Sequence, residues 1–337
     1  MEQQTPSKPS YRGWYLALTV ILAATLLVLA IRGVSWQEML QTLRQAEPKY
    51  LALIIGVGSL SIFIRGMRWG VLISAENKVN PFTMFWATSV GYVGNTFLPA
   101  RAGEVIRSVM LGARTGIAKS YILATAITER IFDVVTLVLI GVVVVPGIGS
   151  LPDWLPQAMR VMGILGVAAI VFLLLLPRMR GLATRLVSKL PLPEKWRSKI
   201  DHLLHDFLLG AEAFIHPGRA AGFLGLTVLV WLLDATGAVL MSRALNLHFT
   251  YPQAFLLLVA MGLSSAIPST PGYVGIYQFV AVTLLPLYGA TRSEALTYIL
   301  ALQASTVLTI LVWGTIGFWR LNTGKRQQPD ADPPPLV

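Results

Sequence analysis

A short group of charged and polar side chains interrupts the apolar segment 81–111. Glu104 and Arg107 are three residues apart and share one face of a helix, and Arg101 precedes them. Arginine binds a phosphate through two parallel hydrogen bonds, and a helix that begins near Gly103 would point its free amides at the same anion. Asn95 lies one helical turn before the break at 99–103, where it could bond the backbone groups that the break leaves without helical partners. The group predicts a cationic pocket for a phosphate; the alternative is that its charges only pair with one another.

A second charged group lies inside the apolar segment 120–145. Glu129 and Asp133 are four residues apart, and Arg130 is within reach of Asp133. One base cannot neutralise two acids, so a further cation must come from elsewhere. The candidates are Arg101, Arg107, Arg65 and Arg68. A structural clamp between helices and a relay for substrate both fit this pattern.

Asp234 stands alone in the apolar segment 220–241, where it is either a proton-coupling residue or a satisfied polar contact.

The sequence does not indicate metal, nucleotide or thiol chemistry. The four histidines lack a plausible set of metal ligands, and no Gly-rich phosphate loop is present, so we expect no metal, no cofactor and no enzyme activity. The chain has no cysteine, and hence no disulfide framework or thiol nucleophile.

The composition explains why these charges are unusual. Of 337 residues, 55% are hydrophobic and 13% are charged, against about 25% charged in soluble proteins. Several uncharged runs exceed the roughly 18 residues that mark a membrane helix. The net charge of +11 then indicates basic loops facing anionic lipid rather than a nucleic-acid partner.

The chain is therefore predicted to be an all-α polytopic membrane protein with about six full spans. A retained first span is followed by an amphipathic segment, 33–49, which we expect to lie along the membrane interface. The predicted spans cover residues 14–31, 50–67, 120–145, 161–177, 220–241 and 295–319.

Two longer apolar stretches, 81–111 and 244–291, are broken in the middle by proline and glycine. Proline removes a backbone donor and glycine permits a sharp turn, so each stretch predicts a re-entrant helical hairpin. Broken backbone is tolerated at membrane depth where protein buries it or water lines it. The residues at the breaks and in the expected cavity are Pro99, Gly103, Pro268, Pro271, Gly272, Gly275 and Gln278.

The two halves of the chain show an internal repeat. An aliphatic-Pro-x-x-x-Gly pattern occurs at both breaks, and Tyr-Ile-Leu-Ala follows each, at Tyr121 and Tyr298. We expect inverted copies at about 13–149 and 158–321 within one membrane domain, 13–321, as in many transporters. Chance similarity in apolar sequence is the alternative.

The distribution of basic residues predicts that both termini face the cytoplasm. Most of the 27 Lys and Arg then fall on that side, many of them in the loop 178–219. Residues 1–12 form a cytoplasmic tail, and the proline-containing tail 322–337 is predicted to be disordered.

On these motifs the chain resembles the transmembrane, flippase-like region of the lysylphosphatidylglycerol synthase family over about residues 12–321. The resemblance implies an integral membrane protein that moves lipid between leaflets or recognises lipid headgroups. Because only about 15 residues follow the last predicted span, we expect this chain to lack the family's aminoacyl-transferase domain. One departure is Gln278, where the family usually has Glu. The matching pieces are Arg65 to Trp69, Asn95 to Glu104 with Arg107, Glu129 to Asp133, and Thr270 to Gly275.

The leading hypothesis is a lipid translocase of the bacterial inner membrane, with an anionic lipid phosphate held by Arg101 and Arg107. Arg65 and Arg68 are assigned to the same phosphate site. A phospholipid and a polyprenyl-linked lipid both fit. The second hypothesis is a non-transporting lipid-binding or scaffold subunit that partners an envelope-lipid enzyme. The third is an ion or small-solute transporter that uses Asp234 and Glu129.

Overall fold

The computed structural model describes residues 11–74, 78–98, 102–147, 154–175, 212–265 and 271–323, together with positions 178, 181, 194 and 208. Every regular element within these ranges is a helix, so the all-α prediction is confirmed. Most of the basic loop 178–219 and the tails 1–10 and 324–337 lie outside the described residues.

The helices begin and end close to the predicted apolar segments. Asn80 caps one of them by accepting from the amide of Phe82 at 2.8 Å, and Gly116, in the left-handed region, ends the next. From the N-terminus to residue 175 they are α1 (Tyr11–Ile31), α2 (Trp36–Arg44), α3 (Pro48–Ile73), α4 (Pro81–Phe97), α5 (Gly103–Thr115), α6 (Lys119–Val144) and α7 (Trp154–Leu175). From residue 217 onward they are α10 (Pro217–Ala244), α11 (Tyr251–Ser264), α12 (Ile276–Leu284) and α13 (Arg292–Thr323). The 3-10 turns are η2 (Val145–Gly147), η4 (Glu212–Ile215), η5 (Pro271–Tyr273) and η6 (Leu285–Tyr288).

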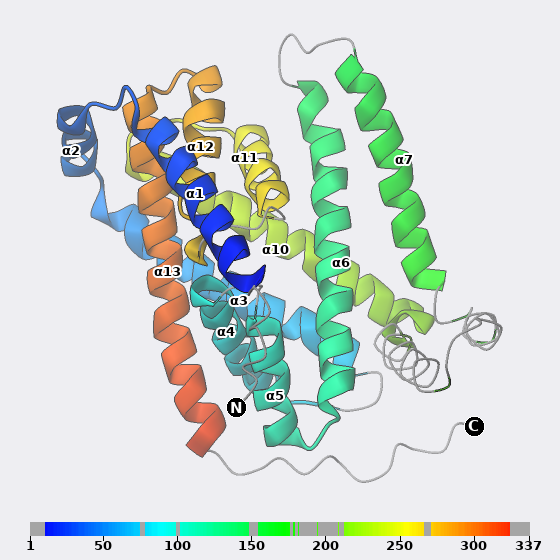
Figure 1. Ribbon diagram of the computed structural model, residues 1–337. Coiled ribbons are helices and arrows are strands. Elements are labelled where there is room, and N and C mark those ends of the chain that lie inside the picture. Colours follow the sequence, from blue (N-terminus) through cyan, green and yellow to red (C-terminus); the bar gives the residue numbers. More distant parts are fainter. Residues whose placement is uncertain are drawn as a thin grey trace, which may run out of the picture.

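The helices α3 and α10 form an antiparallel pair behind the others (Figure 1). Ser61, near the middle of α3, bonds Asp234 in the second half of α10, whereas Arg68 farther along α3 reaches Thr227 nearer the start of α10. Buried apolar side chains gather into two large clusters. One surrounds Tyr298 at the end of the pair where α10 finishes, and the other surrounds Trp69 at the opposite end.

Both predicted breaks appear as breaks between helices. The pair α4–α5 occupies the lower part of Figure 1 and the pair α11–α12 the upper part, so they approach from opposite ends of the molecule. The last turn of α4 meets η5, because a Cβ placed on Gly272 of η5 would lie 3.9 Å from the carbonyl oxygen of Thr96 in α4.

Glycine allows the close contact within the first pair. A Cβ on Gly103 would lie 1.9 Å from the carbonyl oxygen of Gly91, and one on Gly94 would lie 2.6 Å from the Cα of Gly103. No side chain larger than hydrogen fits there. Gly91 and Gly94 thus let α4 pack closely against the start of α5.

By length and apolar composition, three described helices can cross a membrane: α3, α10 and α13. The bent pair α1–α2, with 80° between the two helices, would make a fourth. The helix α6 carries Glu129, Arg130 and Asp133 in its middle, and the apolar stretch of α7 is the shorter Arg160–Leu175. The count of six spans therefore stays a prediction.

Candidate functional site

Charged side chains from four helices meet between α3, α5, α6 and α10. The set contains as many arginines as carboxylates, so it is neutral when all are ionised. A buried ion network is held together by its internal pairing, because an isolated charge at this depth is costly. Its members are Arg65, Arg68, Arg107 and Arg130 with Glu104, Glu129, Asp133 and Asp234.

The deepest part of the network is centred on Glu129. Its Oε1 accepts from Nη2 of Arg68 at 2.7 Å and from Nε at 3.3 Å, and its Oε2 accepts from Arg107 at 2.9 Å. The three side chains are 0 to 2% exposed. Arg68 and Arg107 are thus the extra cations that Glu129 and Asp133 require. Arg68 also donates to Asp133 at 2.7 Å, whereas Arg107 pairs with Glu129.

A second layer joins α5 to α6 through Glu104. This carboxylate pairs with Arg107 on its own helix, and its Oε1 accepts from the Asn95 amide at 3.2 Å. The same oxygen lies 2.8 Å from Nε of Arg130, at an angle that makes an ion pair without a hydrogen bond. Arg130 also donates to Asp133 at 3.1 Å, as the three-residue spacing predicted. The hairpin α4–α5 is therefore bonded to α6 through charges.

Asp234 is a satisfied polar contact rather than a lone acid. It accepts from Ser61 at 2.7 Å and pairs with Arg65, so it links α10 to α3. Arg65 lies between two aromatic rings, with its guanidinium carbon 5.9 Å from the ring centre of Tyr92 and 5.8 Å from that of Trp231. This end of the network is the more open one, since the side chains of Arg65 and Arg130 are 13% and 23% exposed.

Aromatic and hydroxyl groups that the sequence analysis missed complete the network. The guanidinium carbon of Arg107 lies 4.2 Å from the ring centre of Trp69, and the indole of Trp69 donates to Thr125 at 3.0 Å. Tyr92 accepts from Arg130 at 3.4 Å. Sequence spacing offered one signal: Ser61 lies four residues before Arg65, on the same face of α3.

The second hairpin is held by neutral groups. Gln278, 1% exposed, accepts from the amide of Gly275 at 2.7 Å and donates to Gln303 of α13 at 2.6 Å. Gln303 in turn donates to the carbonyl of Gly272 at 2.6 Å. The two glutamines thus fix the bend at the tip with a chain of amide hydrogen bonds. Gln303 was missed, although it is a single amide in an apolar span.

Two features of the backbone require glycine at position 275. Its φ of 90° is in the left-handed region, and a Cβ there would lie 2.3 Å from the carbonyl oxygen of Ala23 in α1. The tip of the second hairpin therefore packs directly on α1. Gly272 is also left-handed, with a φ of 71°.

Several predicted site residues are not placed. Pro99, Arg101 and Pro268 lie outside the described residues, and Pro271 is described only as the first residue of η5. Arg101 as a phosphate ligand stays a prediction. Arg68 and Arg107, which the sequence also assigned to phosphate, have their donors directed at carboxylates.

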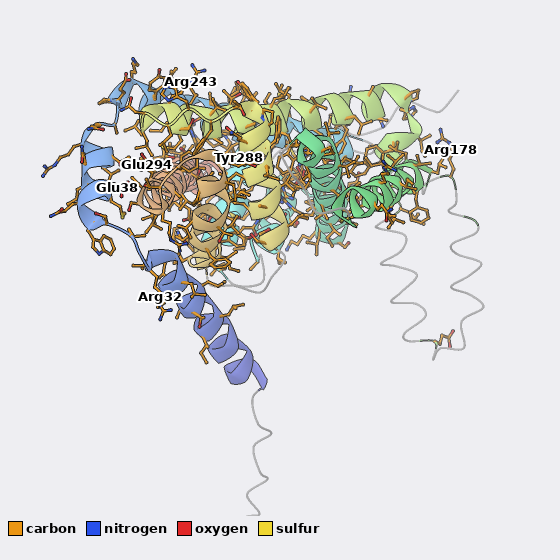
Figure 2. All side chains as sticks on the ribbon, turned by 90° about the horizontal axis from the view of Figure 1, so that it is seen from above. Arg32, Glu38, Arg178, Arg243, Tyr288 and Glu294 are labelled. Atoms are coloured by element: carbon orange, nitrogen blue, oxygen red, sulfur yellow. The ribbon has the colours of Figure 1, made fainter. Side chains whose placement is uncertain are left out.

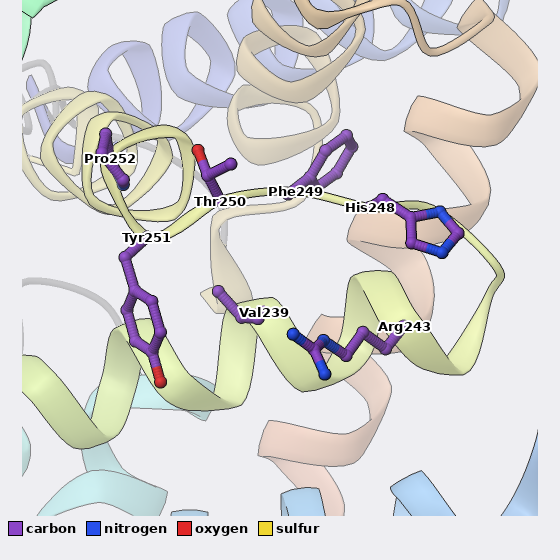
Figure 3. A pocket seen from close by; sticks show the side chains of 7 residues that line it. All are labelled: Val239, Arg243, His248, Phe249, Thr250, Tyr251 and Pro252. Carbon is purple, nitrogen blue, oxygen red and sulfur yellow. The ribbon is translucent and has the colours of Figure 1, made fainter.

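A shallow surface pocket of about 440 Å³ lies apart from the network, where α10 ends and α11 begins (Figure 3). No member of the ion network lines it. Its wall is mostly apolar, with the exposed basic side chains of Arg243 and His248 at one side. The lining residues are Val239, Arg243, His248, Phe249, Thr250, Tyr251 and Pro252.

The chain is similar in sequence to several known proteins. The chain is 23% identical to Glycosyltransferase AglD of Haloferax volcanii over 89% of its own length and 53% of that protein, so it spans about half of that relative. It is 24% identical to a UPF0104 membrane protein of Methanocaldococcus jannaschii, over 70% of this chain and 97% of that one. A UPF0104 membrane protein of Methanothermobacter thermautotrophicus is 23% identical over 82% of this chain and 84% of its own.

No solved structure matches the chain. The family model described as the lysylphosphatidylglycerol synthase TM region matches residues 15–314. Nearly the whole described helical bundle falls within that match. The chain is therefore a multi-pass membrane protein that belongs to the family of lysylphosphatidylglycerol synthase transmembrane regions.

Proposed function

We propose that this protein binds an anionic lipid and moves its headgroup between leaflets along the open end of the arginine–carboxylate network. The observation that carries the proposal is the meeting of two helical hairpins, from opposite ends of the molecule, beside that network. Broken helices that meet at mid-depth are the usual place for a transporter's site. The substrate is a phospholipid or a polyprenyl-linked lipid.

The same proposal includes an inverted repeat, and one pair of matching contacts supports it. The two repeat tyrosines are buried and make matching bonds: Tyr121 on α6 donates to the carbonyl of Leu72 in α3 at 3.2 Å, and Tyr298 on α13 donates to that of Ala238 in α10 at 2.9 Å. In each half, the helix after the hairpin is thus tied to the long helix before it. We assign both termini to the cytoplasmic side on the basis of the basic residues in the sequence. The assignment to a bacterial inner membrane is a proposal that rests on the family resemblance alone.

Phosphate contact is best assigned to the exposed arginines. Arg65 and Arg130 have the most open guanidinium groups of the network and share the ring of Tyr92. Arg68 and Arg107 neutralise Glu129 and hold α3, α5 and α6 in place. A phosphate at Arg65 would compete with Asp234 for the same donors, which gives the network two states.

Proteoliposomes with a fluorescent phosphatidylglycerol and a membrane-impermeant reductant test this function. We expect the wild type to speed transbilayer movement, and Arg65→Gln, Arg130→Gln and Arg101→Gln to slow it. Arg320→Gln is the matched control, because Arg320 is exposed on α13 beside Trp319 and outside the network. Movement that is equal in folded wild type and variants would refute the assignment of these arginines. No movement above protein-free vesicles would refute translocation.

A second candidate is a lipid-binding subunit that acts with a glycosyltransferase. It is favoured by the match to about half of the Haloferax glycosyltransferase, in which this type of chain is part of a longer protein. Copurification of a sugar-transferring activity, together with absence of lipid movement by the pure protein, would support this candidate over translocation. An ion or solute transporter built on Asp234 is less favoured, because Arg65 and Ser61 already satisfy that carboxylate.

A further inference from the structure

The short helix α2 lies at the edge of the bundle beside α13 in both views (Figures 1 and 2). It turns away from α1 by 80°, and Ser35 caps its first turn by accepting from the amide of Glu38 at 3.3 Å. The helix takes no part in the ion network. Its role must therefore be sought in the surface that it presents.

The residues of α2 divide its circumference into three arcs. Successive residues of a helix are about 100° apart, so Trp36, Leu40 and Leu43 fall within an arc of about 60°. These side chains are 60%, 55% and 47% exposed. Met39 and Thr42, on another arc, are buried against the bundle.

The third arc of α2 is polar and exposed. It carries Gln37, Gln41 and Arg44, centred about 100° from the apolar arc. A helix in the plane of a membrane interface, flanked by protein, has these three environments: lipid on one side, water on another and protein on a third. Tryptophan at its start is typical of such interfaces.

Hydrogen bonds hold α2 in this orientation on the start of α13. The amide of Ser35 donates to Ser293 at 2.9 Å, and the hydroxyl of Thr291 donates to Glu38 at 2.6 Å. Arg292 donates to two carbonyls at the end of α1, at 3.0 Å and 3.2 Å. The elbow between α1 and α2 is thus fixed, and the apolar arc cannot rotate inward.

We propose that α2 is an interfacial anchor whose Trp36, Leu40 and Leu43 insert into the boundary between lipid headgroups and acyl chains. A lipid bilayer is the occupant because the chain is a multi-pass membrane protein and the helices on either side of α2 in the sequence also carry exposed apolar side chains, at Val28 of α1 and Leu53 of α3. A multi-pass membrane protein presents such side chains to lipid. The proposal does not depend on whether the protein moves lipid.

The absence of cysteine makes a direct test simple. Each single-cysteine variant carries an environment-sensitive fluorophore and is reconstituted into phosphatidylcholine–phosphatidylglycerol vesicles at low protein density. Trp36→Cys, Leu40→Cys and Leu43→Cys probe the apolar arc. Gln37→Cys and Gln41→Cys are the matched controls on the polar arc, and Met39→Cys gives the response of a position shielded by protein.

Two quenchers separate the possible environments: iodide in the water on both sides of the membrane, and a nitroxide on the upper acyl chain of phosphatidylcholine. We expect the apolar-arc labels to be quenched by the nitroxide at least about twofold more than the polar-arc labels, with the reverse order for iodide. Equal iodide quenching of both arcs would overturn the proposal by placing α2 in water. Protection of the apolar arc from both quenchers, as at Met39→Cys, would overturn it in favour of a second copy of the chain.

Discussion

Substituting Glu129 by glutamine tests whether the network is a set of buried, mutually neutralising charges. The carboxylate accepts three contacts of 2.7 to 3.3 Å from Arg68 and Arg107, and its side chain is 1% exposed. Glu129→Gln keeps the shape and removes the charge, which leaves two arginines partly unpaired. Removing one partner of a buried ion pair costs about 3–5 kcal/mol.

The expected loss is at the lower end of that range. Arg68 keeps Asp133 as a partner and Arg107 keeps Glu104, so neither guanidinium is isolated. We expect the free energy of unfolding to fall by about 3 kcal/mol, which is roughly a hundredfold in the folding equilibrium. Far-UV circular dichroism during a titration from mild detergent into dodecyl sulfate measures this change.

A double variant and a surface control sharpen this test. Arg68→Gln combined with Glu129→Gln restores the balance of charge, so its cost should be smaller than the sum of the single changes by about 1 kcal/mol or more. Lys49→Gln, at an exposed ion pair with Glu47, should not shift the transition. If Glu129→Gln lost less than about 1 kcal/mol, the idea of a dry, compensated network would be refuted.

Three further outcomes follow from the packing of the hairpins and of α2. Gly103→Ala should destabilise the protein by about 1–3 kcal/mol or more because its methyl group meets backbone, whereas Gly237→Ala, with open space around it, should be neutral or slightly stabilising in thermal unfolding. Gln303→Leu should cost about 1–3 kcal/mol by leaving a buried amide and carbonyl without partners, and limited proteolysis should then cut near the second hairpin; unchanged cleavage would contradict that role. The hydrogen bond from Thr291 holds the pKa of Glu38 below its ordinary value of 4.5, so its contribution to docking of α2 is complete above that pH and is lost as the pH falls through the lowered pKa. The protection of α2 amides, taken as the intrinsic exchange rate at each pH divided by the observed rate, should therefore fall in acid for the wild type, and in Glu38→Gln it should be equally low above and below that range.

The class of the protein could be predicted from composition and periodicity. The apolar runs predicted helices close to their observed bounds, because an apolar run of this length must bond its own backbone in lipid. The breaks in both hairpins could also be predicted, since proline and glycine act locally. The i,i+3 pairs Glu104–Arg107 and Arg130–Asp133 followed from helix geometry alone.

Partners from distant segments could not be predicted in the same way. The sequence showed that Glu129 and Asp133 needed another cation, but it left the choice open among four arginines. The structure selects Arg68 and Arg107, which are buried by helices from other parts of the chain. The partner of Asp234 could not be predicted for the same reason. Asp234 stands alone in its own segment, and only the packing of α3 brings Arg65 against it.

The sequence by itself determined a membrane-embedded helical chain, the positions of its breaks and the residues whose charge had to be compensated. These properties depend on spacing along one segment and on the cost of placing charge in lipid. Only the tertiary structure decided which arginine meets which carboxylate and which arginine side chains stay partly exposed. It also decided that Gln278 and Gln303 close the second hairpin without charge. Such pairings depend on how α3, α5, α6, α10 and α13 pack, and contacts between segments far apart in sequence leave no periodic signal in either one.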